Sequence, residues 1–139
     1  MSRPQMAVVG IGATGAVLAA ALIKERPDTV LVASSEVKAA TLRDNGLSVS
    51  GALSFQTPVE RAVGGVAALA DAPPEVVILA TKTFHLPMVL DELAAVFRPG
   101  MKIVSAHNGL GTEDLIAQRF GPQAALRMSL NYGVGLEAP

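Results

Sequence analysis

Three glycines near the amino end, at positions 10, 12 and 15, constrain the fold of this chain more than any other feature. They follow a short apolar run, Met6–Val9, and they precede an alanine-rich run from Ala16 to Lys24. The first run predicts a buried strand and the second predicts a helix that begins near Ala13. The pattern Gly-x-Gly-x-x-Gly at such a turn between strand and helix is typical of a dinucleotide-binding loop.

Each glycine of this loop has a separate physical task. Gly10 allows backbone angles that a Cβ atom would forbid, Gly12 lets a pyrophosphate approach the main chain, and Gly15 lets the helix pack closely on the strand. The first N–H groups of the helix then face the phosphates at the positive end of the helix dipole. The predicted cofactor-binding loop comprises Gly10, Ile11, Gly12, Ala13, Thr14 and Gly15.

The rest of the chain alternates between strand-like and helix-like segments. Strands are predicted at 29–33, 75–81, 102–105 and 125–130, and helices at 37–45, 86–97 and 112–120. Segments 47–50 and 53–57 suggest a short hairpin or two extended segments, and 66–70 a short helical turn. Ser35 and Thr112 are the expected helix N-caps. This order predicts an α/β, Rossmann-type, doubly wound and mostly parallel sheet, as one NAD(P)-binding domain over residues 1–139.

Composition excludes several classes of function. The chain has no cysteine, which excludes disulfides and thiolate chemistry, and its net charge of -1 comes without a basic patch for nucleic acid. No cluster of His, Asp and Glu has metal-ligand spacing, so no metal is expected. The apolar run from Met6 to Ile23 resembles a signal peptide or a short membrane span. Because it contains the glycine pattern and leads into a second strand, a cytoplasmic protein without a membrane segment is the simpler interpretation.

The end of the second predicted strand bears on the type of cofactor. In dinucleotide folds an acidic residue there accepts the ribose 2′-hydroxyl of NAD and repels the 2′-phosphate of NADP. This chain has Ser34 and Ser35 at that place, and with Lys38 they could hold a 2′-phosphate. NADP is therefore favoured over NAD. Two alternatives stay open: the serines only cap the helix, or Glu36 reaches the ribose.

Other candidates lie where later strands end, because ligands of such sheets bind beyond the carboxyl ends of the strands. Thr81 and Lys82 follow one strand, and Asn108 follows the next. Lys82 could place its ammonium near a developing alkoxide or a substrate carboxylate, and its alternative is a solvated surface lysine. Asn108 could donate to substrate or form an Asx turn with Gly109. His107 is an acid–base candidate, although a loop histidine is more often structural.

Several segments, in this order, resemble the ketopantoate reductases (2-dehydropantoate 2-reductases). They read GIGATG, LVASSE, LRDNGL, ATKT, HNGLGTED and FGP. The resemblance implies that NADPH reduces the ketone of 2-dehydropantoate to pantoate, on the route to pantothenate and coenzyme A. It also implies that Lys82 is the strand-end lysine near nicotinamide and substrate, and that Asn108 is the asparagine that hydrogen-bonds there. Both are thus candidates for catalysis and for cofactor binding, with Thr81 beside them.

The chain departs from the family's pattern in sequence and in length. Ser34 stands where an arginine commonly holds the 2′-phosphate, Thr14 replaces an aliphatic residue, and His107 replaces glutamine. Family members carry a C-terminal helical domain, and that domain holds the lysine that acts as general acid and a substrate-binding glutamate. We therefore expect the cofactor-binding half of a 2-oxo acid reductase, completed by a helical domain or a partner chain, and a homo-oligomer is compatible with this. A non-catalytic nucleotide-binding or sensing module, or a reductase of another 2-oxo acid, are the alternatives.

Overall fold

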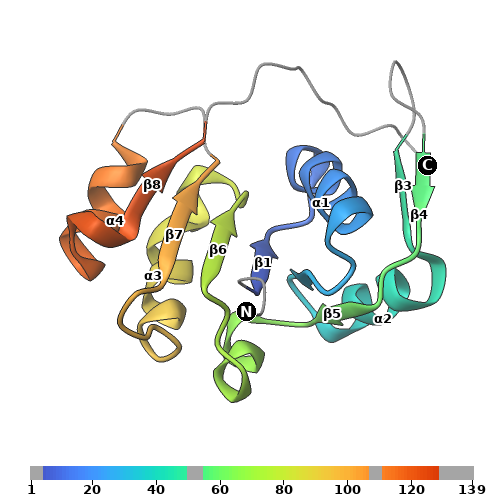
Figure 1. Ribbon diagram of the computed structural model, residues 1–139, viewed down its shortest axis with the longest axis horizontal. Coiled ribbons are helices and arrows are strands. Elements are labelled where there is room, and N and C mark those ends of the chain that lie inside the picture. Colours follow the sequence, from blue (N-terminus) through green and yellow to red (C-terminus); the bar gives the residue numbers. More distant parts are fainter. Residues whose placement is uncertain (1–4, 50–54, 107–110, 129–139) are drawn as a thin grey trace.

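Parallel strands form the centre of the molecule. The computed structural model describes residues 5–49, 55–106 and 111–128. Six strands pair in the order β5-β2-β1-β6-β7-β8, and every pairing in this sheet is parallel. The chain moves outward from β1 to β2 and β5, then returns to the other side of β1 with β6 (Figure 1). The predicted Rossmann-type fold is confirmed. The strands are β1 (Met6–Val9), β2 (Val30–Val32), β5 (Arg61–Val63), β6 (Val76–Leu79), β7 (Lys102–Ser105) and β8 (Ala125–Arg127).

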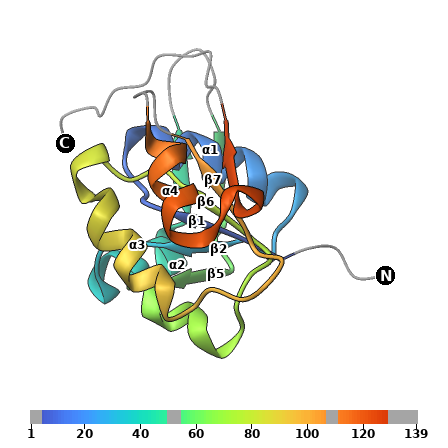
Figure 2. The same cartoon turned by 90° about the vertical axis from the view of Figure 1, so that its left-hand side faces the viewer.

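Helical segments cover both faces of this sheet, so its strands are apolar on both sides. Val8 packs with residues of α1 (Ala13–Glu25) and α2 (Glu36–Asn45), whereas its neighbour Val9 packs with residues of α3 and α4 on the opposite face. Figure 2 looks onto the β8 end of the sheet, with α4 nearest the viewer. The remaining segments are η1 (Val66–Asp71), η2 (Thr83–His85), α3 (Leu86–Ala94), α4 (Thr112–Phe120) and η3 (Pro122–Ala124).

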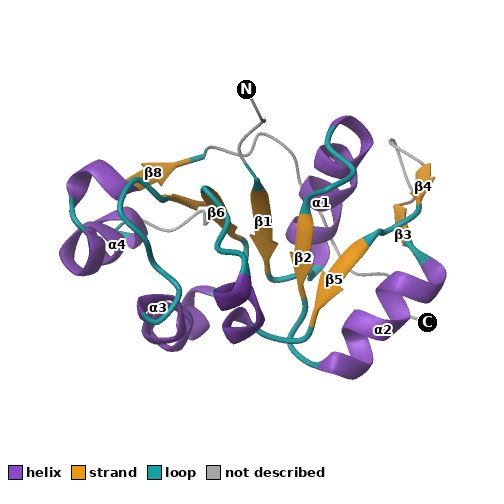
Figure 3. Cartoon of the chain, turned by 60° about the horizontal axis from the view of Figure 1, so that its bottom comes forward, coloured by secondary structure: helices purple, strands orange, loops and turns teal. Residues whose placement is uncertain are grey.

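A small antiparallel hairpin stands apart from the main sheet. It consists of β3 (Leu47–Val49) and β4 (Phe55–Thr57), as the alternating pattern predicted, and it contacts α1. Figure 3 separates the two halves of the chain: β5, α2 and the hairpin lie on one side of β1, and α3, α4 and β8 lie on the other. The crevice of a doubly wound sheet therefore falls between β1 and β6.

The ends of two helices differ from their predicted positions. The predicted N-cap Thr112 is wrong: Gly111, at φ 89°, precedes α4, and Thr112 is its first residue, 2% exposed. The reason is that the Thr112 hydroxyl pairs with a buried side chain of the sheet instead of a backbone N–H. The other helix, α3, ends at Ala94 and not at Phe97, because its last turn tightens into a bond from Val96 N to Leu93 O.

The strand β5 was missing from the predicted elements. Its three residues are exposed, buried and half-buried in turn, and Gly64 and Gly65 end it at once. Three residues are too few for hydrophobic periodicity to identify. Residues 61–63 form a strand because their backbone pairs with β2. Beside this pairing, Ala33 N donates to Val63 O at 2.9 Å.

The long apolar run at the amino end is divided between two elements. The turn at Gly10–Gly12 separates β1 from α1, so the run from Met6 to Ile23 does not form one helix. Among residues 5–49, 55–106 and 111–128, none of the helices has the length and apolar character needed to span a membrane.

Candidate functional site

The glycine turn has the geometry that a dinucleotide loop requires. Gly10 has a φ of 96°, and a Cβ there would come within 2.8 Å of the Thr81 backbone nitrogen. A Cβ at Gly15 would lie 1.8 Å from the Gly10 carbonyl oxygen, so only glycine lets α1 approach the turn this closely. The turn is thus held between the start of α1 and the end of β6.

The amino end of α1 leaves room and hydrogen-bond donors for an anion. Gly12 is the N-cap residue, no side chain caps the helix, and its first turn has no acidic residue. A Cβ built on Gly12 would meet nothing within 4 Å. Because the first N–H groups of a helix have no partner inside it, the donors beside Gly12 are available to a phosphate.

The end of β2 places both predicted serines at the same edge of the sheet as the glycine turn. Ser34 is exposed, whereas Ser35 is half-buried and its Oγ accepts from Lys38 N at 3.2 Å. The capping role foreseen as an alternative for Ser35 is therefore present, and Ser34 and the exposed Lys38 side chain remain at the surface. Both can face a charged group of a ligand at this edge.

A glycine after β5, Gly64, also lies at this edge of the sheet, and the sequence did not single it out. A Cβ at Gly64 would lie 2.5 Å from Glu36 N, so the chain after β5 passes directly against the start of α2. The pair Gly64–Gly65 was interpreted only as a break between elements. The sequence places these glycines near the site only if β5 is predicted, because β5 pairs with β2 and so brings the two glycines to the carboxyl ends of the other strands.

The acidic side chain nearest to the serines is engaged elsewhere. Glu36 Oε1 lies 2.6 Å from Arg43 Nη2, two turns along α2, and Arg43 Nη1 donates to Ala62 O at 2.6 Å. Arg43 thus ties α2 to β5 and holds the Glu36 carboxylate along the helix. The arrangement opposes the alternative in which Glu36 reads the ribose.

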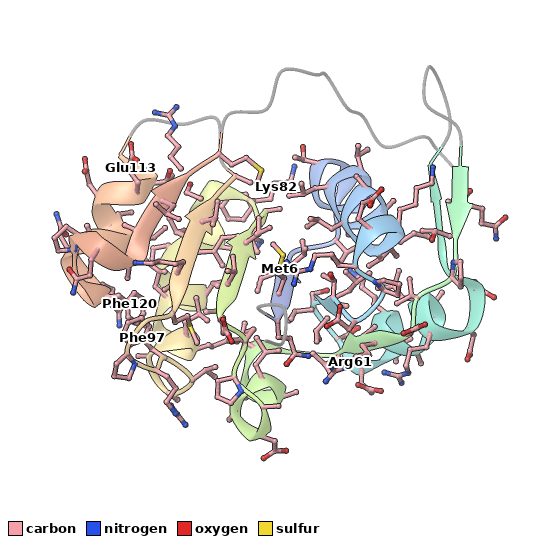
Figure 4. All side chains as sticks on the ribbon, in the orientation of Figure 1. Met6, Arg61, Lys82, Phe97, Glu113 and Phe120 are labelled. Carbon is pink, nitrogen blue, oxygen red and sulfur yellow. The ribbon has the colours of Figure 1, made fainter. Side chains whose placement is uncertain are left out.

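The end of β6 brings Thr81 and Lys82 beside the glycine turn. Thr81 lies against Gly10, and its Oγ1 is shielded from solvent without a hydrogen-bond partner among the described residues. Lys82 is exposed, and Figure 4 shows its side chain at the upper edge of the sheet, far from Arg61 at the lower edge. Thr81 and Lys82 therefore lie on the opposite side of the glycine turn from Ser34 and Ser35.

Two of the candidates cannot be placed. Asn108 and His107 lie outside the described residues, which stop at Ala106 and resume at Gly111. On either side of them, Ser105 ends β7 and Thr112 begins α4, and their hydroxyl oxygens lie 2.7 Å apart. Within the described part of the chain, no group of three or more His, Cys, Asp or Glu residues could hold a metal ion.

The model of the ketopantoate reductase PanE/ApbA family matches residues 6–139, which is almost the whole chain. The chain belongs to this family. The resemblance proposed from the glycine loop and the strand-end motifs is confirmed.

Relatives of this family match the chain over part of their own length. The 2-dehydropantoate 2-reductase of Streptococcus pyogenes serotype M1 is 27% identical over 135 residues, covering 95% of this chain and 42% of the relative. The crystal structure of 2-dehydropantoate 2-reductase from Geobacter metallireducens GS-15 is 26% identical with a TM-score of 0.72, over 84% of this chain and 38% of that one. The chain therefore spans about two fifths of the length of these relatives.

The fold extends beyond close relatives. D-mandelate dehydrogenase, solved with NADH and anilino(oxo)acetate, superposes with a TM-score of 0.81 over 97% of this chain and 43% of that chain. The identity is 19%, so the likeness concerns the fold alone.

Proposed function

We propose that this ketopantoate reductase family chain is the cofactor-binding half of an NADPH-dependent reductase, with 2-dehydropantoate as the favoured 2-oxo acid substrate. The observation that carries the proposal is the glycine turn, with its uncapped helix start and the open space beside Gly12. Pyrophosphate fits this place because it needs N–H donors, a positive helix end and no obstructing side chain. Membership of the family adds the class of reaction.

Preference for NADP follows from the charges around the end of β2. A 2′-phosphate needs donors or a cation and is repelled by a nearby carboxylate. Ser34 and Lys38 are exposed there, and Glu36 is paired with Arg43. The missing arginine at position 34 makes this a weaker phosphate site than the family's pattern implies, so we expect a moderate preference.

The chain's own residues bind and orient the reacting groups. Bound NADPH would supply the hydride for the ketone carbon. Lys82, exposed beside the glycine turn, would donate a hydrogen bond to the oxygen that gains charge, and we propose the same neighbourhood for Asn108. The proton that completes the alcohol would come from the remaining part of the enzyme, where the family's general acid belongs.

Cofactor binding and turnover are tested in two steps. We expect NADPH to raise the melting temperature of the 139-residue chain and to change its own fluorescence, with no turnover by the chain alone. Saturating NADPH without either effect would contradict the proposal. Adding the helical half of a family member and following ketopantoate-dependent NADPH oxidation then tests the substrate.

The same experiment separates the two alternatives. A non-catalytic nucleotide-binding module would bind NADPH and remain inactive after the helical half is supplied. A reductase of another 2-oxo acid would oxidise NADPH with that acid and not with ketopantoate.

A further inference from the structure

We propose that the hydroxyl of Thr81 is a hydrogen-bonding group for the nicotinamide half of the dinucleotide, and that it turns toward this ligand when the ligand binds. This inference rests on the proposed function. It assigns to one side chain at the end of β6 a role in holding the reactive half of the cofactor, separate from the glycine turn that holds the pyrophosphate.

The first observation is a buried polar atom without a partner. Thr81 Oγ1 is shielded from solvent and makes no hydrogen bond among the residues described, unlike the buried Thr29, whose Oγ1 donates to Arg26 O at 2.8 Å. An unpaired buried hydroxyl destabilises the folded state, and a valine of the same shape would remove that cost. Threonine at position 81 is therefore unfavourable for folding unless a ligand completes its bonding.

The second observation is the position of Thr81 relative to the glycine turn. Its backbone nitrogen lies 2.8 Å from the point that a Cβ on Gly10 would occupy, so the two segments of the chain are in direct contact. The strand order β2-β1-β6 places Ser34 and Thr81 on opposite sides of that turn. A dinucleotide whose adenosine half lies over β2 and whose pyrophosphate lies on the turn must extend its nicotinamide half over β6.

A rotation about χ1 connects the two observations. Thr81 as a whole is only half-buried, so part of the residue is accessible to solvent although its hydroxyl is shielded. Threonine has staggered χ1 rotamers that exchange the hydroxyl and methyl positions. Rotation breaks no hydrogen bond of this hydroxyl among the described residues, and in the proposed bound rotamer the hydroxyl faces the accessible part of the site. There it can donate to a ribose or phosphate oxygen.

The test compares two ligands and three variants of the 139-residue chain. The ligands are NADPH and 2′,5′-ADP, which lacks the nicotinamide half. For Thr81→Val we expect a Kd for NADPH that is about fivefold to thirtyfold higher, the size of one lost hydrogen bond. We expect an unchanged Kd for 2′,5′-ADP and a melting temperature without ligand that is equal or higher. Thr81→Ser, which keeps the hydroxyl, should retain the Kd for NADPH within about threefold.

Thr29→Val is the matched control, because it removes a buried and paired hydroxyl at the opposite edge of the sheet. It should lower the melting temperature and leave the Kd for NADPH unchanged. The inference is overturned if Thr81→Val leaves NADPH binding unchanged, weakens 2′,5′-ADP equally, or lowers the ligand-free melting temperature as Thr29→Val does. If the unmodified chain binds neither ligand, the proposed function itself fails, and this inference with it.

Discussion

The hydroxyl oxygens of Ser105 and Thr112 lie 2.7 Å apart, and both residues are at most 2% exposed. Ser105 ends β7 and Thr112 begins α4, so the hydrogen bond joins the two ends of the segment that contains Asn108. Buried hydroxyls keep their stabilising effect only while both partners are present. This pair therefore ties the carboxyl end of β7 to the first turn of α4.

Thr112→Val should destabilise the chain by about 0.5 to 1.5 kcal/mol, because it removes the hydrogen bond between the two hydroxyls. Urea unfolding, followed by far-UV circular dichroism, measures the loss. Thr41→Val is the control, since Thr41 is exposed on α2 and its hydroxyl donates to Val37 O within the same helix. Equal free energies of unfolding for the Thr112 variant and the unmodified chain would show that the pair does not stabilise the fold.

Two glycines of the same loop should respond in opposite ways to alanine. Gly15→Ala should cost at least about 3 kcal/mol, because its Cβ would lie 1.8 Å from Gly10 O. Gly12→Ala should fold with a loss within about 1 kcal/mol, since its Cβ meets nothing within 4 Å. The added methyl should nevertheless weaken NADPH binding. Thermal melts with and without NADPH separate the two effects, and a Gly12→Ala variant as unstable as Gly15→Ala would contradict this account.

Local sequence patterns were sufficient to predict several elements of the fold. The runs Met6–Val9 and Lys102–Ser105 became strands with the predicted bounds, because each contains adjacent apolar residues, two of them β-branched, and is flanked by turn-forming segments. Ser35 caps α2 as predicted, since the bond from Lys38 N to its Oγ is local. These features depend on residues that are close in the chain.

Features that depend on distant contacts could not be predicted in this way. Arg61–Val63 is a strand only because β2 lies beside it. Thr112 pairs with Ser105 and does not cap the helix, because α4 packs on β7. The candidate site has the same limit. Gly64 approaches Glu36 across two elements, and Arg43 holds that carboxylate from two turns further along α2.

Ser34→Asp should reverse the preference between the cofactors. A carboxylate at the end of β2 repels the 2′-phosphate and accepts the 2′-hydroxyl, so the Kd for NADPH should rise at least about tenfold while that for NADH does not rise. Ser34→Arg should lower the Kd for NADPH, because a guanidinium can bind the 2′-phosphate. Fluorescence titrations measure both constants. Ser48→Asp, exposed on β3, controls for added charge, and the same loss of NADPH binding in both aspartate variants would refute the role of Ser34.

The pairing of Glu36 with Arg43 should also influence this preference. Arg43→Met frees the Glu36 carboxylate near the end of β2, so the Kd for NADPH should rise about threefold to tenfold and the Kd for NADH should not. Because Glu36 is mostly exposed and one further hydrogen bond of Arg43 is lost, stability should fall by about 1 kcal/mol. The double variant Arg43→Met with Glu36→Gln should recover NADPH binding. Without that recovery, the effect of Arg43 is its own positive charge.

Lys82→Ala should impair turnover far more than cofactor binding. In the enzyme completed with the helical half, we expect kcat to fall at least about a hundredfold, because the lost ammonium would stabilise charge on the reacting oxygen. The Kd for NADPH should change by less than about fivefold, since the phosphates are held elsewhere. Lys24→Ala, exposed in the last turn of α1, is the control for loss of a lysine. If both variants keep the original kcat, Lys82 is a solvated surface residue and the reacting oxygen is bound by other groups.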